Sequence, residues 1–138
     1  MEKVKIYCDG ACSNNQSKRN KGGWGALLLY MDTVKEIYGG EENTTNQRME
    51  LTACMKALSL IKKSSVEIEI FSDSAYLVNC FHQKWYLRWE VNGWLNSKKK
   101  PVENQDLWVE LLALIRKLNV RFIKVKGHSG DRYNERAD

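Results

Sequence analysis

The stretch from Thr44 to Phe71, TTNQRMELTACMKALSLIKKSSVEIEIF, joins a helix to a strand. Thr44 or Thr45 can cap a helix that runs to about Lys63, because apolar side chains recur at helical spacing along one face. The residues on this face are Leu51, Cys54, Met55, Ala57, Leu58 and Ile61. Two serines then precede residues 66–71, which alternate with the period of a strand. A helix that leads into a strand in this way is typical of a crossover between parallel strands.

The residues before this stretch predict a strand and a hairpin. Residues 3–8 alternate with period two, and we expect Asp9-Gly10 to end that strand. The predicted segments that follow are a polar loop over 11–21, hairpin strands over 26–31 and 34–38, and a break at Gly39-Gly40.

The residues after it predict two more helices, another strand and the start of a last helix. The predicted segments are a helix through Tyr76, Leu77 and Cys80, an irregular stretch over 84–101, a helix over 106–118, a strand over 120–125, a loop over 126–130 and a helix from Asn134 to Asp138. A hairpin followed by crossovers predicts an α/β fold, with one mixed sheet and helices packed on it. We expect residues 1–138 to form a single domain.

Composition excludes several classes of protein. Of the 138 residues, 43% are apolar and 28% are charged, which is ordinary for a folded soluble chain. No apolar run is long enough for a membrane helix and the N-terminus is no signal peptide, so we expect a cytoplasmic protein without a membrane partner. Four cysteines without CxxC spacing predict reduced thiols rather than a zinc site. The net charge of +5 favours an anionic partner without naming it.

Glu50 lies in the middle of the apolar face of the first predicted helix. An unpaired buried carboxylate costs several kcal/mol, so this position needs an explanation. Either Glu50 sits in the first helical turn, where the helix dipole favours an acid and the side chain reaches water, or it faces a cation.

Two further acids favour the cation. Asp9 follows the first strand and Asp73 follows the strand over 66–71, and ligands of open α/β sheets bind beyond the carboxyl ends of strands. Taken singly, Asp9-Gly10 can form a turn and Asp73 can cap a helix. Together with Glu50, however, they form a converging group of acids that a divalent cation would stabilise. Oxygen ligands of this kind suit Mg²⁺ or Mn²⁺, and two such ions can support phosphodiester cleavage.

The chain resembles type 1 ribonuclease H, which cuts the RNA strand of RNA–DNA hybrids. The resemblance extends over the whole chain and rests on several motifs that occur in order. They are Tyr7-Cys-Asp-Gly10, Gly22-Gly-Trp-Gly25, Thr44-Thr-Asn-Gln-Arg-Met-Glu-Leu51, Ser72-Asp-Ser74, Lys100-Pro-Val-Glu-Asn104, Val125-Lys-Gly-His-Ser-Gly130 and Asn134-Glu-Arg-Ala-Asp138.

The resemblance implies a five-stranded mixed sheet flanked by helices and a catalytic site of four carboxylates, Asp9, Glu50, Asp73 and Asp138. It implies that Asp9 bridges two Mg²⁺ ions, for which Mn²⁺ can substitute. By the same analogy Asp138 helps hold the ion that activates water, and Glu50 and Asp73 help hold the ion beside the leaving 3′-oxygen. His128 matches a loop histidine that assists proton transfer or product release.

The resemblance also implies how the substrate is held. Asn15, Asn46 and Gln47 match residues that contact RNA 2′-hydroxyls, and Thr45 and Asn104 match residues that hold a phosphate of the DNA strand. The tryptophan-rich basic stretch at about 84–101 matches a protruding basic handle. Within it, Trp85 matches an aromatic that packs on DNA sugars, and we expect Trp89 and Trp94 to form the small core of the handle.

Three departures from the family pattern qualify these expectations. The loop over 13–21 is longer than usual, Asn43 replaces a basic residue found in some members, and the last helix stops at Asp138. The third departure motivates an alternative, a hybrid-binding module with impaired catalysis. Another nuclease of the same superfamily, such as a DNA resolvase or integrase core, is a further alternative that the Thr45-Asn46-Gln47 pattern disfavours. We expect a monomer.

Overall fold

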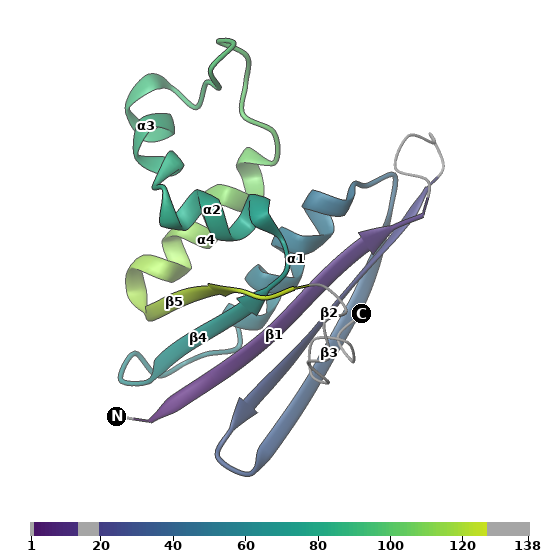
Figure 1. Cartoon of the computed structure of the whole chain (residues 1–138), viewed down its shortest axis with the longest axis vertical. Helices are drawn as coiled ribbons and strands as arrows, with labels where there is room; N and C mark the ends of the chain where they lie inside the picture. The colour runs from purple at the N-terminus through teal and green to yellow at the C-terminus, as the bar shows by residue number, and fades with distance from the viewer. Residues whose placement is uncertain (1, 14–19, 127–138) are drawn as a thin grey trace.

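The computed structural model describes residues 2–13 and 20–126. Within these residues five strands form one sheet in the order β3-β2-β1-β4-β5 (Figure 1). The strands are β1 (Lys3–Cys12), β2 (Lys21–Tyr30), β3 (Thr33–Glu42), β4 (Glu67–Ser72) and β5 (Asn119–Lys124). The pairs β1–β2 and β2–β3 are antiparallel, and β1–β4 and β4–β5 are parallel. The predicted mixed α/β sheet is confirmed.

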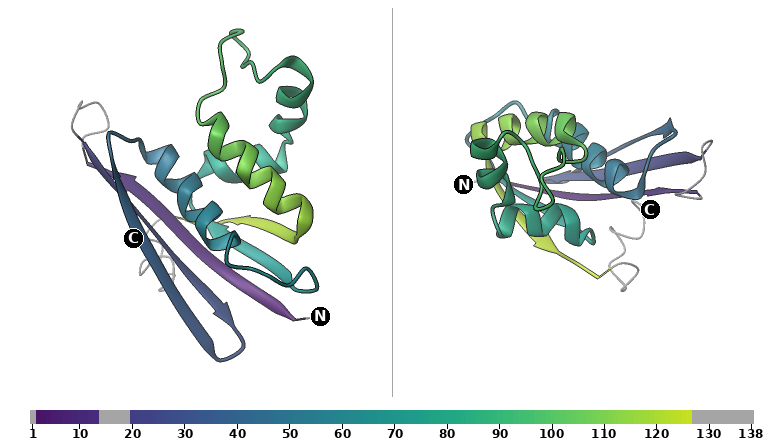
Figure 2. Two further views of the ribbon diagram at one scale, coloured as in Figure 1. Left: turned by 180° about the vertical axis from the view of Figure 1, so that it is seen from behind. Right: turned by 90° about the horizontal axis from the view of Figure 1, so that it is seen from above.

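Four helices accompany this sheet within the described residues. They are α1 (Asn46–Leu58), α2 (Ala75–His82), α3 (Trp85–Asn92) and α4 (Gln105–Lys117). Helix α1 packs on β1 and β2, while α4 packs against α1 and β5. The view from above shows α1 and α4 on the same side of the sheet (Figure 2). Helix α1 therefore lies over the central strand β1 and its antiparallel neighbour β2.

One hydrophobic cluster joins the sheet to the helices. The inward residues Ile6 and Cys8 of β1 and Ile68 and Ile70 of β4 are fully buried, as the period-two pattern predicts. Trp108 of α4 is fully buried in the same cluster. Within the described residues no helix has both the length and the apolar character that a membrane crossing requires.

The first three strands are longer than the sequence predicts, because glycines that resemble breaks lie inside them. Strand β1 continues through Asp9 and Gly10 to Cys12, and β3 continues through Gly39-Gly40. At Gly39 a Cβ atom would lie 2.7 Å from the ring of Trp24, so the missing side chain makes room for that ring across the β2–β3 pair. Gly39 therefore allows the Trp24 ring to lie close to the backbone and does not form a turn.

The helix boundaries also differ from the prediction. Helix α1 ends at Leu58, not near Lys63, and Ser59 is its C-cap. After this cap the backbone forms tighter hydrogen bonds between residues three apart, such as that from the Leu60 N–H to the Ala57 carbonyl oxygen. Helix α3 was not predicted at all. It follows Lys84, which has a left-handed φ of 58°, and it has no side-chain cap and no fully buried residue, so its start is not marked in the sequence.

Candidate metal centre

Glu50 is buried beside the central strand of the sheet. Its side chain belongs to the second turn of α1, because that helix begins at Asn46 after the Thr45 cap and has no acid in its first turn. The residue is 8% exposed, and its Oε2 atom has no hydrogen-bond partner among the described residues. The alternative of a first-turn acid that reaches water is therefore wrong, and Glu50 needs another source of positive charge.

Gly10 allows Glu50 to come this close to β1. A Cβ atom on Gly10 would lie 2.4 Å from the backbone carbon of Met49 and 2.6 Å from the nitrogen of Glu50. Any side chain at this position would push α1 away from the strand. The Asp9-Gly10 pair, which the sequence suggests as a turn, thus sets the distance between the strand and the helix.

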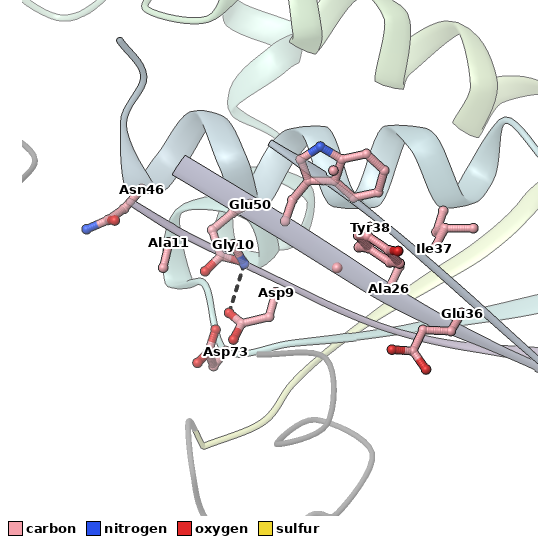
Figure 3. Close-up of a pocket in the computed structure, with 14 residues that line it drawn as sticks. Asp9, Gly10, Ala11, Ala26, Glu36, Ile37, Tyr38, Asn46, Glu50 and Asp73 are labelled. Carbon is pink, nitrogen blue, oxygen red and sulfur yellow. Dashed lines mark hydrogen bonds between the residues drawn. The ribbon is translucent and has the colours of Figure 1, made fainter. Parts of the chain in front are cut away.

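Asp9 and Asp73 lie on neighbouring parallel strands at the same edge of the sheet. Asp73 directly follows β4, and both residues are two positions beyond the Tyr7–Phe71 pair of the β1–β4 ladder. One carboxylate oxygen from each of Asp9, Glu50 and Asp73 lies within 4.8 Å of the other two (Figure 3). The prediction that these three acids converge is confirmed.

The described residues supply no cationic partner for the three carboxylates. Within the described residues none of them forms a salt bridge, and Asp9 Oδ1 accepts only from the Gly10 N–H at 3.0 Å. Burial, followed by the nearby Cys8 thiol and the Asp73 carboxylate, raises the pKa of Glu50 from 4.5 to about 9, which a hydrogen bond from Gly10 N–H partly offsets. A divalent cation would supply the missing charge and a partner for the orphaned oxygen, so the donor set fits Mg²⁺ or Mn²⁺.

A groove of about 770 Å³ leads from the carboxylates across β2 and β3. Asp9, Glu50 and Asp73 line one part of it, while Tyr38 lines the part over the hairpin (Figure 3). Trp24 of β2 also lines the groove. The carboxylates are therefore open to a ligand larger than an ion.

The predicted RNA-contacting residues that the structure describes stand at the start of α1. Asn46 and Gln47 are exposed, and Asn46 also lines the groove. The side-chain oxygen of Asn46 accepts from the Cys12 N–H at 2.6 Å, which ties the first turn of α1 to the end of β1.

The predicted phosphate-contacting residues Thr45 and Asn104 meet through Arg48. Thr45 caps α1 by accepting the Arg48 N–H at 3.1 Å, so the sequence-based expectation of a cap is correct. Asn104 precedes α4 but makes no side-chain capping bond, contrary to the capping role that its position suggests. Its Oδ1 instead accepts from the Arg48 guanidinium at 3.3 Å.

The predicted basic handle contains α3 and the loop after it, and it projects away from the sheet (Figure 1). Trp85 is half-buried and its indole N–H donates to Gln83 at 2.9 Å. Trp89 contacts Trp94, with ring centroids 5.8 Å apart, and also contacts the buried Trp108, at 5.6 Å. The tryptophans therefore connect the handle to the main core rather than forming a separate core.

The handle also presents its lysines to solvent. Asn96 Oδ1 accepts the backbone N–H groups of Lys98 and Lys100, which shapes the loop, and residues 98–100 are exposed. The single acid of the stretch, Glu90, is engaged by Arg116 of α4 at 2.6 and 2.7 Å. The exposed charge of this loop is therefore positive.

Three predicted site residues, Asn15, His128 and Asp138, lie outside the described residues. Two further residues of the site were not predicted from the sequence. They are Gly10, where β1 and α1 approach closely, and Arg48, which links α1 to α4. A signal for Arg48 exists, because a cation in the first turn of a helix opposes the helix dipole and predicts acidic partners elsewhere.

Comparisons with known proteins agree with this geometry. A sequence profile of the RNase H family matches residues 1–138. A protein of Syntrophomonas wolfei named Ribonuclease H is 56% identical over 138 residues, which cover 100% of this chain and 92% of that protein.

Two solved structures share the fold. LC9-RNase H1, a type 1 RNase H with the type 2 active-site motif, matches with a TM-score of 0.86 and 28% identity, over 99% of this chain and 69% of that one. LC11-RNase H1 in complex with RNA/DNA hybrid matches with a TM-score of 0.67 and 17% identity, over 96% and 91% of the two chains.

Proposed function

The chain belongs to the ribonuclease H family, and from this premise we propose that it hydrolyses the RNA strand of RNA–DNA hybrids and leaves 3′-hydroxyl and 5′-phosphate ends. The main support for the proposal is the buried oxygen of Glu50, which lies beside Asp9 and Asp73 and has no hydrogen-bond partner among the described residues. A group of acids without a cation in the described part of the chain is a poor structural element but a suitable receptor for a divalent metal ion. The hybrid in the LC11-RNase H1 complex supports the choice of substrate.

In this proposal Asp9, Glu50, Asp73 and Asp138 hold two Mg²⁺ ions, with Asp9 serving both. The ions, when bound, supply positive charge to the attacking and leaving oxygens of the scissile phosphodiester. The carboxylates fix where that charge lies, and Gly10 sets the depth of Glu50. His128 moves a proton or helps product release.

The remaining polar residues hold the substrate. Asn15, Asn46 and Gln47 contact 2′-hydroxyls, which both donate and accept, so amides can distinguish RNA from DNA. Thr45 and Asn104 hold a DNA-strand phosphate. Trp85 and the lysines of the handle add stacking area and a salt-dependent share of the affinity.

Residues 1–138 act, in this proposal, as one catalytic domain and as a monomer. The four cysteines are reduced thiols, and three of them are buried, which supports a reducing compartment such as the cytoplasm.

A cleavage assay tests the proposal. A hybrid labelled on the RNA strand should be cut when Mg²⁺ is added and remain intact in EDTA, and the products should be substrates for enzymes that need a 3′-hydroxyl. Single-stranded RNA and duplex DNA of the same sequence are the controls. Binding of the hybrid without any cleavage in Mg²⁺ or Mn²⁺ would instead indicate a binding module.

A further inference from the structure

Arg48 joins three elements through its guanidinium group. Its Nη1 and Nη2 atoms donate to the two carboxylate oxygens of Asp106 at 3.1 and 2.7 Å, and its Nε lies 3.6 Å from Glu41. Arg48 is on α1, Asp106 on α4 and Glu41 on β3. Because two carboxylates face one guanidinium, the charge of Arg48 is already balanced within the protein.

The same guanidinium orients the amide of Asn104. Nη1 donates to Asn104 Oδ1 at 3.3 Å, which directs the amide NH₂ group to the opposite side. That side chain also interacts with the Tyr76 hydroxyl, which accepts from the indole of Trp108 at 3.0 Å. An amide has two N–H donors, so one donor remains for a ligand after Tyr76 is served.

The backbone of Arg48 orients Thr45 in the same manner. The Arg48 N–H donates to Thr45 Oγ1 at 3.1 Å, which occupies a lone pair of the hydroxyl and leaves its proton to donate elsewhere. Thr45 is exposed and Asn104 is half-buried, so both remaining donors can reach a ligand.

We propose that Arg48 is a positioning residue that holds Thr45 and Asn104 with their donors directed at one phosphate of the DNA strand. This inference rests on the proposed function, which assigns that phosphate to the two side chains. Arg48 itself does not pair with the phosphate, because Asp106 and Glu41 already take its charge. Neutral donors thus bind the anion, and a guanidinium fixes their direction.

The substitution Arg48→Lys separates orientation from charge. Lysine keeps the positive charge but lacks the planar fork that spans Asp106 and Asn104 together. Affinity is measured by fluorescence anisotropy in EDTA, with a short labelled hybrid and with hybrids that carry one neutral methylphosphonate at successive DNA-strand positions. The unsubstituted protein should bind one of these modified hybrids about tenfold more weakly than the unmodified hybrid. In that hybrid the methylphosphonate replaces the phosphate that accepts a charge-assisted hydrogen bond.

For Arg48→Lys we expect roughly fivefold to tenfold weaker binding of the unmodified hybrid and no further loss at that position. The slope of affinity against salt concentration should stay unchanged, whereas loss of a direct cation–phosphate contact would reduce it by about one. Asp106→Asn, which releases the guanidinium but keeps Arg48, should act in the same direction and decides the question if Arg48→Lys does not fold.

Arg116→Lys is the matched control. Arg116 also forms a paired contact with a carboxylate, Glu90, at 2.6 and 2.7 Å, but it has no contact with Asn104. This variant should keep full sensitivity to the methylphosphonate at the critical position.

Two comparisons separate the failure of this inference from failure of the proposed function. Asn104→Ala and Thr45→Ala should lose sensitivity at the same phosphate as Arg48→Lys. If those two variants lose it while Arg48→Lys and Asp106→Asn keep it, the role of Arg48 is refuted and the phosphate assignment stands. If Asn104→Ala and Thr45→Ala keep it as well, the phosphate assignment itself is wrong and the inference falls with it.

Discussion

Two buried glutamates lie close to the β1–β4 strand pair, and their surroundings differ. Glu69, in the middle of β4, is 8% exposed and its carboxylate lies 3.5 Å from the ammonium group of Lys3. Glu50 of α1 is also 8% exposed, but one of its oxygens has no hydrogen-bond partner among the described residues, and two further acids lie nearby. Burial is equal for the two glutamates, so burial alone does not mark a functional acid. What differs is that Glu69 has a cationic partner, whereas the described residues supply none for Glu50.

The largest expected effect belongs to Asp9→Asn, which removes a charge from the acid cluster around Glu50 and leaves Glu69 unchanged. Because Asp9 is proposed to serve both ions, we expect hybrid cleavage to fall by about a thousandfold or more, with hybrid binding retained. Initial rates in Mg²⁺ measure this. Activity within tenfold of the unsubstituted protein would show that Asp9 is not a shared ligand.

The second largest effect is expected for Gly10→Ala, because this substitution keeps all charges and changes only the distance between β1 and α1. The added Cβ would overlap the backbone of Met49, so α1 must shift, with a cost of about 2–4 kcal/mol in the free energy of unfolding and a large loss of Mg²⁺ affinity. Denaturant unfolding and calorimetric titration measure the two effects.

Gly23→Ala provides the control for that substitution. A Cβ there would meet nothing closer than the Gly39 carbonyl oxygen at 3.8 Å, so we expect the free energy of unfolding to change by less than about 1 kcal/mol. Equal effects of the two substitutions would argue against the close approach at Gly10.

Glu50→Gln should stabilise the metal-free protein at alkaline pH. Since the pKa of Glu50 is raised from 4.5 to about 9, the folded state binds its proton more tightly than the unfolded state, and stability falls as pH rises through that window. Glutamine removes this penalty, so we expect a Tm roughly 5–10 °C higher than that of the unsubstituted protein at pH 8 in EDTA, and no such gain at pH 4.

Repeating the same thermal melts with Mg²⁺ provides a further test. The ion should raise the Tm of the unsubstituted protein and raise that of Glu50→Gln much less, because the variant lacks the charge that the ion balances. A lower Tm for the variant at every pH would mean that the Glu50 carboxylate is stabilised by the protein itself.

Glu69→Gln, at the second buried glutamate, should have the smallest effect. Lys3 is partly exposed, so its ion pair is screened and its loss should destabilise the protein by about 0.5–1 kcal/mol, with unchanged cleavage. Thermal melts and initial rates measure this. A loss of cleavage comparable to that of Asp9→Asn would remove the distinction between Glu69 and the acids around Glu50.

The convergence of Asp9, Glu50 and Asp73 could be predicted because it depends on periodicity and topology. The helical pattern places Glu50 among apolar residues, and a parallel pair of strands brings Asp9 and Asp73 to one edge. These regularities extend over many residues, so small errors in strand length do not disturb them.

The unpredicted features depend on single contacts between distant residues. Gly10 resembles a turn residue until Met49 is known to lie against it, and Gly39 resembles a break until the Trp24 ring covers it. Arg48 binds Asp106, 58 residues away, and no local pattern reveals that partner. Helix α3 is held by the partly buried Trp85, Tyr86 and Trp89, which pack on the core formed by distant residues such as Trp108.

Crystals of the protein soaked in Mn²⁺ and measured at the manganese absorption edge show directly whether the three acids bind a divalent cation. We expect an anomalous peak at ligand distance, about 2.2 Å, from oxygens of Asp9, Glu50 and Asp73, including the Glu50 oxygen that has no hydrogen-bond partner among the described residues. A peak that appears only elsewhere, or none at saturating Mn²⁺, would contradict it.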